Sequence, residues 1–256
     1  ISINTSGLVG LWHFNNESAF GEATLEAGLN NKTVDFSVYV NSERATANAN
    51  NGTFLNGATI NKTNYKFGGG AGQFDGSDDR VQVDSGTILK TTPLSICAQF
   101  KNNGGAGAQT IFSIADVDST GNHFDFTIVP SDSNKVYAEV KDASTSTTAK
   151  TSTGYTVGMW HHACVVFISS TERRAYIDGG SEGIDTTSIT PTAAALDNTN
   201  IGVLRRSTSI FYFNGSIDEV AIWNRSLSSA EIMNLYKRGA NRLNISVRSC
   251  DDSSCS

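Results

Sequence analysis

Two pairs of adjacent ionisable side chains come closest to a catalytic arrangement. Asp218 and Glu219 lie in a run that alternates like a β-strand, so we expect them on opposite faces of it. Retaining glycoside hydrolysis instead needs two carboxyl groups about 5 to 5.5 Å apart. His161 and His162 alternate in the same way, and no Gly-x-Ser-x-Gly elbow accompanies them. The sequence therefore predicts no catalytic residue and a protein that is not an enzyme.

A pair of cysteines near the C-terminal end offers a second kind of chemistry. Cys250 and Cys255 are spaced as Cys-x4-Cys among Ser and Asp residues, without the His or second Cys pair that a zinc site needs. We expect these two residues to form a local disulfide.

Asn-x-Ser/Thr sequons are the third feature of this kind, and each is a possible glycan acceptor in a secreted protein. Roughly five would occur by chance in a chain this rich in Asn, Ser and Thr, so the excess is mild. We expect at least one to be occupied if the source cell can glycosylate. The sequons are at Asn4, Asn16, Asn31, Asn51, Asn61, Asn214, Asn224 and Asn244.

Composition predicts an all-β extracellular protein and excludes two kinds of partner. Charged residues make up 17% of the chain, against about 25% in an average domain. The formal net charge is -6 with no basic block, so nothing would neutralise the phosphates of a nucleic acid. No run of 18 apolar residues predicts a membrane span. The length of 256 residues permits one large sandwich.

A strand, a turn and a capped helix follow one another over residues 213–232. The strand alternates apolar positions up to Trp223. Ser228 stands three residues before Glu231, which is a capping-box pattern that predicts the start of a helix. Apolar positions at helical spacing extend it over residues 228–238, and Gly239 is expected to end it.

Three further segments occur in a recognisable order: Gly7–Phe14, Gly72–Val81 and Trp160–Phe167. Together with residues 213–232 they resemble the LamG-like jelly-roll domains of the concanavalin A-like lectin and glucanase superfamily. The resemblance covers most of residues 7 to 240. It makes Gly72–Val81 the family's Phe-Asp-Gly hairpin, and it makes Leu94–Phe100 a strand in which Gln99 stands where Trp is usual.

This resemblance implies two facing antiparallel sheets and one short helix, with Trp12, Val166, Val220 and Ile222 in the core. It also places Cys97 and Cys164 in sheet strands. A bridge between them is possible if their Cα atoms approach within about 7 Å, and two buried free thiols are the alternative.

Calcium is the ion that the resemblance implies, as a structural Ca2+ where the last strand meets an N-terminal loop. Asp218, Asp35 and Asn51 match that site, and Ca2+ prefers oxygen ligands of this kind. The alternative is that Asp218 caps its strand by accepting hydrogen bonds from nearby backbone N–H groups. The EF-hand-like run that begins at Asp116 has Thr127 where Glu is needed, so we interpret it as a hairpin turn.

The chain divides into a sandwich over residues 1–240 and an extension over 241–256. The extension alternates like a strand and is predicted to begin a further β segment or a linker. The polar insert over residues 17–63 is a candidate for the loops of a binding rim. The absence of a visible leader favours a mature product or a fragment.

Function follows from the resemblance. It implies a non-catalytic binding or adhesion module outside the cell or on its surface, with glycans or surface proteins as ligands. The alternative is a building block of a filament, sheath or virion that assembles with copies of itself. A catalytic glycoside hydrolase sandwich is the third possibility, but the Glu-x-Asp-x-x-Glu motif that it requires is missing. The loop aromatics to inspect for sugar contacts are Tyr65, Tyr155, Phe211 and Tyr212.

Overall fold

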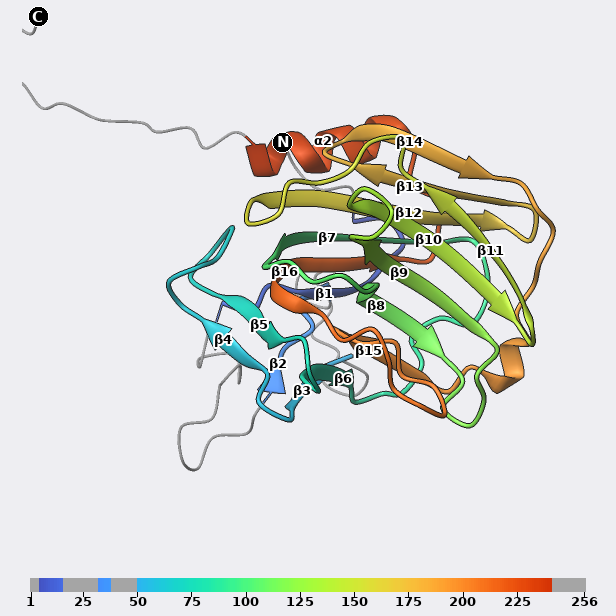
Figure 1. The fold of residues 1–256 in the computed structure, drawn as a ribbon, viewed down its shortest axis with the longest axis horizontal. Coiled ribbons are helices and arrows are strands. Elements are labelled where there is room, and N and C mark those ends of the chain that lie inside the picture. Colours follow the sequence, from blue (N-terminus) through green and yellow to red (C-terminus); the bar gives the residue numbers. More distant parts are fainter. Residues whose placement is uncertain (1–4, 16–31, 38–49, 241–256) are drawn as a thin grey trace, which may run out of the picture.

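The computed structural model describes residues 5–15, 32–37 and 50–240 of the chain. Their strands form two antiparallel eight-stranded sheets that face each other (Figure 1). The order in sheet A is β14-β13-β12-β7-β16-β5-β4, with β1 paired to β16. The order in sheet B is β11-β10-β9-β8-β15-β6-β3-β2. The predicted all-β jelly-roll sandwich is therefore confirmed.

The strands of sheet A are β1 (Leu8–Trp12), β4 (Thr59–Asn61), β5 (Ala71–Asp75), β7 (Leu94–Asn102), β12 (Trp160–Ser169), β13 (Glu172–Ile177), β14 (Gly180–Asp185) and β16 (Asn214–Trp223). Those of sheet B are β2 (Lys32–Thr33), β3 (Gly52–Leu55), β6 (Arg80–Val83), β8 (Gln109–Ala115), β9 (His123–Val129), β10 (Lys135–Asp142), β11 (Thr145–Lys150) and β15 (Asn198–Ile201). The 3-10 turn η2 (Ala193–Ala195) and helix α2 (Ser229–Ala240) complete the described elements.

The core between the sheets is built by alternation along the strands. Trp12, Val220 and Ile222 lie in this core, as predicted. Val166 is also a buried core residue, as predicted, and it belongs to a second apolar cluster on the outer face of sheet A. Both faces of β12 are apolar, and alternation alone does not tell which one meets the other sheet.

The segment containing the Phe-Asp-Gly motif is not a hairpin. Its first strand, β5, belongs to sheet A and its second, β6, belongs to sheet B. The turn between them is held by Asp79, whose Oδ2 accepts a hydrogen bond from the backbone N–H of Asp75 at 2.9 Å. The predicted hairpin is therefore a crossing from one sheet to the other.

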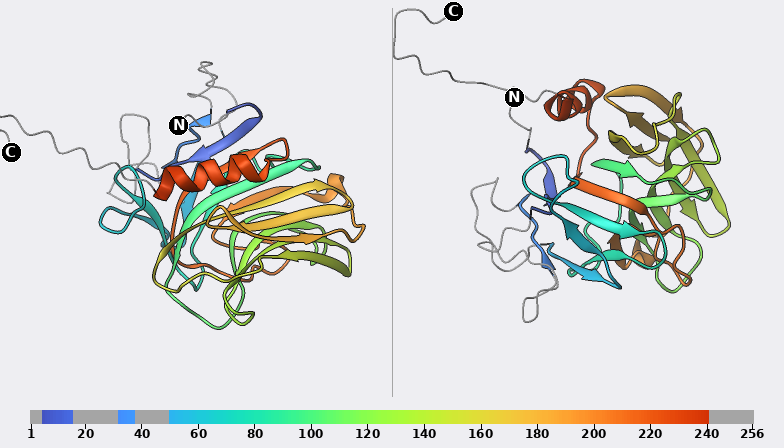
Figure 2. Two further views of the ribbon diagram at one scale, coloured as in Figure 1. Left: turned by 90° about the horizontal axis from the view of Figure 1, so that it is seen from above. Right: turned by 60° about the vertical axis from the view of Figure 1, so that its left-hand side comes forward.

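Helix α2 packs on the outer face of sheet A (Figure 2). The predicted capping box is present, because the N–H of Glu231 donates to Ser228 Oγ at 3.3 Å and the N–H of Ser228 donates to Glu231 Oε2 at 3.0 Å. Ile232 and Leu235 bury the apolar face of the helix in the second cluster. The helix runs to Ala240, so Gly239 does not end it as predicted; helix ends are defined only to within one or two residues.

The outer face of sheet B is polar. One row of directly paired residues crosses seven of its strands: Thr53, Gln82, Asn200, Ser113, Asp125, Glu139 and Thr148. The segment after β15 lies against this row. Ser113 Oγ donates to the carbonyl of Val203 at 2.8 Å, and Arg205 donates to Gln82 Oε1 at 2.6 Å. The outer face of sheet B therefore buries a row of hydrogen-bonding groups, whereas that of sheet A carries an apolar cluster beside buried polar residues such as Gln99 and Asp218.

Candidate functional site

A β-bulge in β16 shapes the outer face of sheet A. Asp218 pairs with Gln99 and Ala221 pairs with Cys97, so two residues of β16 oppose one residue of β7. Glu219 sits in the bulge with a φ of 51°. The extra residue breaks the alternation and brings Glu219 to the same outer face as Asp218. The prediction that these two carboxylates point to opposite faces is therefore wrong.

Two depressions adjoin and share Gln99 and His162 of this face, and the second extends to the start of β12 and the loop before it. The first has a volume of about 300 Å³ and lies between β1, β16 and α2. Its other lining residues are Leu11, His13, Asn15, Phe67, Cys97, Glu219, Ala221, Trp223, Leu235 and Arg238. The second has a volume of about 360 Å³, and it is also lined by Lys66, Thr156, Met159, Trp160, His161, Asp178 and Tyr236. We call the two together the sheet A depression.

Charged and aromatic side chains face each other across the depression. His13 Nδ1 lies 2.6 Å from Glu219 Oε1, so these side chains form a partly exposed pair at one end. At the other end, His161 Nδ1 lies 2.7 Å from Asp178 Oδ2, and its Nε2 accepts a hydrogen bond from the N–H of Thr156 at 2.9 Å. Two polar groups and several rings therefore line one recess, which suits a ligand that has both hydroxyl groups and apolar faces.

The two adjacent histidines of β12 have different surroundings. His161 packs its ring near Phe100 and Tyr155 of the core, whereas His162 lies on the outer face with Cys164. The predicted alternation of these residues is confirmed. Burial lowers the pKa of His162 to about 4, so its imidazole is neutral at pH 7. Its Nδ1 has no hydrogen-bond partner among the described residues.

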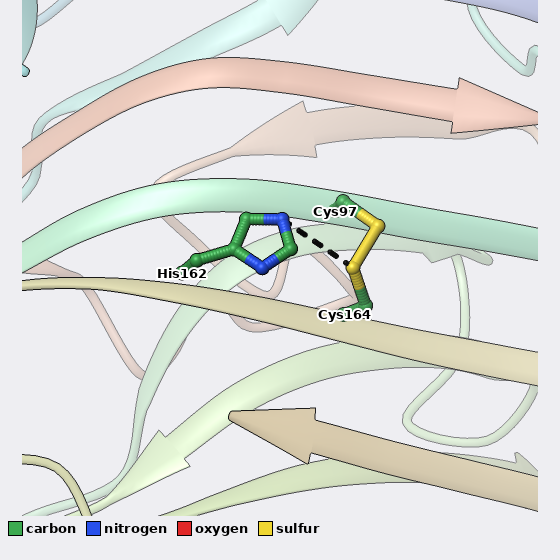
Figure 3. A group of neighbouring side chains, drawn as sticks. All are labelled: Cys97, His162 and Cys164. Carbon is green, nitrogen blue, oxygen red and sulfur yellow. Dashed lines mark hydrogen bonds between the residues drawn. A yellow bond between two sulfur atoms is a disulfide. The ribbon is translucent and has the colours of Figure 1, made fainter. Parts of the chain in front are cut away.

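A disulfide between Cys97 and Cys164 forms part of the floor of the depression (Figure 3). The two residues pair directly across β7 and β12, and their Cα atoms are 4.1 Å apart. The structure thus decides between the two alternatives for these cysteines in favour of the bridge. The other predicted bridge, between Cys250 and Cys255, lies outside the described residues.

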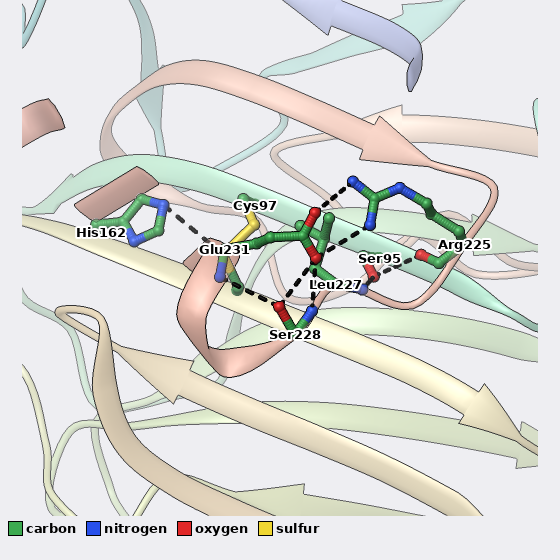
Figure 4. Close-up of a disulfide and its surroundings, with 8 residues drawn as sticks. Ser95, Cys97, His162, Arg225, Leu227, Ser228 and Glu231 are labelled. Atoms are coloured by element: carbon green, nitrogen blue, oxygen red, sulfur yellow. Dashed lines mark hydrogen bonds and ion pairs between the residues drawn. A yellow bond between two sulfur atoms is a disulfide. The ribbon is translucent and has the colours of Figure 1, made fainter. Parts of the chain in front are cut away.

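The start of α2 is fixed beside this disulfide (Figure 4). Ser95 Oγ donates to the carbonyl of Arg225 at 2.8 Å and accepts from the N–H of Leu227 at 2.9 Å. Arg225 pairs with Glu231 at 2.8 Å, and this guanidinium lowers the pKa of the Glu231 carboxyl to about 2. These contacts tie the turn before the helix to β7, so the helix forms a fixed wall of the depression.

The residues predicted to bind calcium are engaged by the backbone. Asp35 Oδ1 accepts hydrogen bonds from the N–H groups of Leu11 and Ser37, and Asn51 Oδ1 accepts one from the N–H of Asp35. Asp35 and Asn51 are therefore brought together. Among the described residues, the hydrogen-bond partners of Asp218 are instead Lys66, Phe67 and Glu219, none of which bonds to Asp35 or Asn51.

Asp218 shows the capping arrangement that was the alternative to calcium. Its carboxylate accepts hydrogen bonds from the N–H groups of Lys66, Phe67 and Glu219, at 2.8 to 3.0 Å. Burial, and then the charge of Glu219, raise the pKa of Asp218 to about 8. The side chains as they stand bind backbone rather than converge on an ion, and calcium at this position stays a prediction.

Two other acidic groups occur among the described residues. One comprises Asp75, Asp78 and Asp79, and the other comprises Asp116, Asp118 and Asp197. Asp116 and Asp118 of the second group lie in the turn between the paired strands β8 and β9, and Asp197 reaches it from the start of β15, so the EF-hand-like run is a hairpin turn as interpreted. Asp118 N–H donates to Asp116 Oδ1 at 3.0 Å within that turn. Both groups thus belong to turn structure.

Four of the eight sequons lie within the described residues: Asn51, Asn61, Asn214 and Asn224. Asn224 is exposed, whereas the other three are partly buried. The Asn61 side chain also accepts hydrogen bonds from Thr63 and Asn64, which holds it in a turn. Asn224 is therefore the described sequon best placed to carry a glycan. Asn4, Asn16, Asn31 and Asn244 lie outside the described residues.

The aromatic residues singled out from the sequence do not line this depression. Tyr155 is buried in the core, and neither it nor Tyr65, Phe211 or Tyr212 lines the depression. The lining rings are instead Phe67, Trp160, Trp223 and Tyr236. One signal was available, because Gln99 stands where the family usually has Trp. That substitution leaves a smaller, polar side chain where the two depressions meet.

Comparison with known proteins agrees with this fold. The family model of the concanavalin A-like lectin/glucanases superfamily matches residues 74–233, which is more than half of the chain. The chain belongs to this superfamily. No curated protein sequence matches it significantly.

Solved structures with the same fold include domain 4 of AbnA, an extracellular GH43 arabinanase from Geobacillus stearothermophilus, in complex with arabinotriose. The TM-score is 0.61 at 16% identity, over 90% of this chain and 98% of that one. The CBM40 of a Ruminococcus gnavus IT-sialidase, bound to α2,3-sialyllactose, gives 0.51 at 15% identity, over 57% and 84%. NanB sialidase from Streptococcus pneumoniae gives 0.52 at 20% identity, over 64% and 27%. At these identities the similarity shows the fold alone.

The described part of the chain contains no helix that is long and apolar enough to cross a membrane.

Proposed function

We propose that this chain is a non-catalytic extracellular module that binds glycans in the sheet A depression. The observation that carries the proposal is the combination of rings and hydrogen-bonding side chains around one open recess. Phe67, Trp160 and Tyr236 are partly exposed, so each offers ring surface to a ligand. Gln99, His13 and Glu219 supply donors and acceptors between them.

This combination suits a sugar. A pyranose or furanose ring has C–H-rich faces that pack on aromatic rings, and its edge carries hydroxyl groups that donate and accept hydrogen bonds. Two of the structural neighbours were solved with oligosaccharides bound, which supports the same class of ligand. A recess of a few hundred cubic ångströms, open to solvent, holds about one or two sugar units.

The state of the ionisable groups supports a binding role rather than catalysis. Asp218 is fully buried and already accepts three backbone hydrogen bonds, so it has no free oxygen for a substrate. Glu219 is paired with His13, and His161 is held by Asp178 and Thr156.

The disulfide and the exposed sequon at Asn224 support a location outside the cell. Disulfides persist in oxidising compartments and are rare in reducing ones. Adhesion to glycosylated surfaces is the biological role that follows from glycan binding in such a place.

The alternative of self-assembly has weaker support. The large apolar side chains that are exposed among the described residues are Val157, Met159, Ile184 and Phe211, and only Val157 and Met159 share one loop. An assembly interface would require a broader apolar surface. A sedimentation experiment on the full chain at rising concentration tests this alternative, which requires oligomers that the glycan-binding proposal does not.

The proposal is tested by screening the full chain on an oligosaccharide array and measuring the affinity for the best hit by calorimetry. Tyr236→Ala and Trp160→Ala should each weaken that affinity about tenfold or more, because each removes a stacking surface. Phe211→Ala removes an exposed ring that does not line the depression and serves as the matched control. Equal losses in all three variants, or no binding to any array member, would contradict the proposal.

A further inference from the structure

Three side chains on the floor of the sheet A depression have the chemistry of a metal site (Figure 3). Cys97 comes from β7, whereas His162 and Cys164 come from β12 and lie two residues apart on its outer face. One potential ligand atom from each lies within 4.8 Å of the other two. All three residues are buried. In the structure the two sulfur atoms are joined to each other rather than to a metal.

The position of His162 fits this role. Its Nε2 lies 3.7 Å from Cys164 Sγ. In a tetrahedral zinc site, with Zn–N about 2.05 Å and Zn–S about 2.3 Å, a nitrogen and a sulfur ligand are about 3.6 Å apart. The imidazole is therefore already close to the spacing that a shared zinc ion would impose.

The other nitrogen of His162 is unusual. His162 is 5% exposed, and its Nδ1 has no hydrogen-bond partner among the described residues. A buried polar atom without a partner is costly, so its retention calls for an explanation. The proposed ion would bind through Nε2, so it would place the ring proton on Nδ1 rather than give that nitrogen a partner.

The positions of Cys97 and Cys164 would allow both sulfur atoms to bind one zinc ion. Two thiolates on one zinc ion lie about 3.8 Å apart, which side-chain rotation permits for directly opposed residues whose Cα atoms are 4.1 Å apart. The depression lies beside them, since Cys97, His162 and Gln99 all line it. A fourth position on the ion would therefore open toward this space and be filled by water.

We propose that reduction of the Cys97–Cys164 disulfide creates a zinc site formed by Cys97, Cys164 and His162. A dithiol reductant supplies two electrons and two protons, so the S–S bond breaks, two thiols form and the reductant becomes a disulfide. Binding of Zn2+ then displaces the two thiol protons and leaves two thiolates and the imidazole on the ion. This inference does not depend on glycan binding.

Such an ion would replace one cross-link by another. The disulfide joins β7 to β12 in the oxidised chain, and a zinc ion held by the same residues would join the same strands in the reduced chain. Soft thiolate and imidazole ligands select Zn2+ or a similar transition metal over Ca2+ or Mg2+.

The test uses the full chain with Cys250→Ser and Cys255→Ser, so that only one cysteine pair remains, and Co2+ as a coloured substitute for Zn2+. After reduction with a phosphine, the protein should bind one Co2+ and show the intense thiolate-to-cobalt absorption of a tetrahedral site, and Zn2+ should abolish the absorption. The oxidised protein should show none. His162→Ala should lower the affinity at least about tenfold, since even the loss of an outer-sphere partner costs 10- to 100-fold.

His123→Ala is the matched control, because His123 is an equally buried histidine on sheet B. It should bind Co2+ as the parent does. Absence of the absorption in the reduced parent, or an unchanged affinity in His162→Ala, would overturn the proposal and leave the disulfide as a structural bridge alone. If reduction unfolds the chain, Zn2+ should restore its β-sheet circular dichroism spectrum, and failure to do so would equally overturn it.

Discussion

The outer faces of the two sheets are covered in different ways. On sheet A the outward residues of β7, β12 and β16 include an apolar cluster that contains Cys97, Cys164, Val166, Ala221 and Trp223, and α2 packs on this cluster. On sheet B the outward residues form a polar row, and the segment after β15 lies against it. The cover of sheet A is incomplete, and the depression lies where it ends. A ligand site in this sandwich thus depends on what packs outside the sheets more than on the sheets themselves.

The two faces also differ in how a buried carboxyl group is hydrogen-bonded. Asp218 on sheet A accepts three backbone hydrogen bonds. Asp125 on sheet B is 2% exposed, and its Oδ1 has no partner among the described residues. A buried polar oxygen without a hydrogen bond costs about 1 to 3 kcal/mol. Asp125 therefore carries a cost that Asp218 avoids, and stability measurements should separate these two carboxyl groups.

The largest expected effect concerns the cross-link within sheet A. The double variant Cys97→Ala and Cys164→Ala should lose about 4 kcal/mol of unfolding free energy, because the bridge closes a loop with a sequence separation of 67 residues. Urea unfolding measures this loss. The parent should lose a similar amount when reduced in the presence of a chelator. A loss below about 1 kcal/mol would mean that the bridge does little to hold this face together.

The second-largest expected effect comes from weakening the packing of α2 on sheet A. Ile232→Ala truncates the buried side chain of α2 and should cost about 3 kcal/mol, within the range for large-to-small substitutions in a packed core. Phe211→Ala, an exposed ring in the segment after β15, should cost less than about 1 kcal/mol. Chemical denaturation compares the two variants. Similar losses would indicate that both faces depend on their covers to the same degree.

Much of the fold was accessible from the sequence. The capping box at Ser228 and Glu231 and the alternation of β16 are local patterns, and local physics decides them. The exchange of sheets between β5 and β6 was not accessible, since a short turn with Asp and Gly serves a hairpin or a crossing equally well. Which of the two apolar clusters Val166 joins was not accessible either, because both faces of β12 are apolar.

The site was less predictable, and the reason is the bulge at Glu219. One inserted residue moves every residue on one side of the bulge to the opposite face of the strand. No residue type in the strand predicts this insertion. The depression also combines residues from β1, β7, β12, β16 and α2, whose approach depends on tertiary packing. Only Gln99 was visible as a departure from the family pattern.

The response to calcium also compares a buried carboxyl group on sheet A with one on sheet B. If an ion binds at Asp218, Ca2+ at 100 times its dissociation constant should stabilise the chain by about 2.7 kcal/mol. Chelation should then lower the melting temperature of the parent and of Asp125→Asn, the matched carboxylate on sheet B, but not that of Asp218→Ala. A response of Asp218→Ala equal to that of the parent would remove this residue from any calcium site.

The pH dependence of the unfolding free energy should show whether Asp125 is protonated in the folded chain. Burial, and then the charge of Glu139, raise its pKa to about 8. Because the folded chain keeps a proton that the unfolded chain releases near pH 4, stability should fall as pH rises from about 4 to 8, by up to about 1.4 kcal/mol per unit from this group. Asp125→Asn cannot ionise, so denaturation curves across this range should show a smaller fall. An unchanged slope would show that Asp125 is ionised in the folded state.

The central claim is that the sheet A depression binds a glycan, and Gln99→Trp tests it most directly. The larger side chain would fill the space where the two depressions meet while restoring the residue usual in the family. Titration of the best oligosaccharide from the array should show at least about a tenfold loss of affinity in this variant, with an unfolding free energy within about 1 kcal/mol of the parent. Unchanged affinity in a folded Gln99→Trp protein would contradict the account and place the ligand elsewhere.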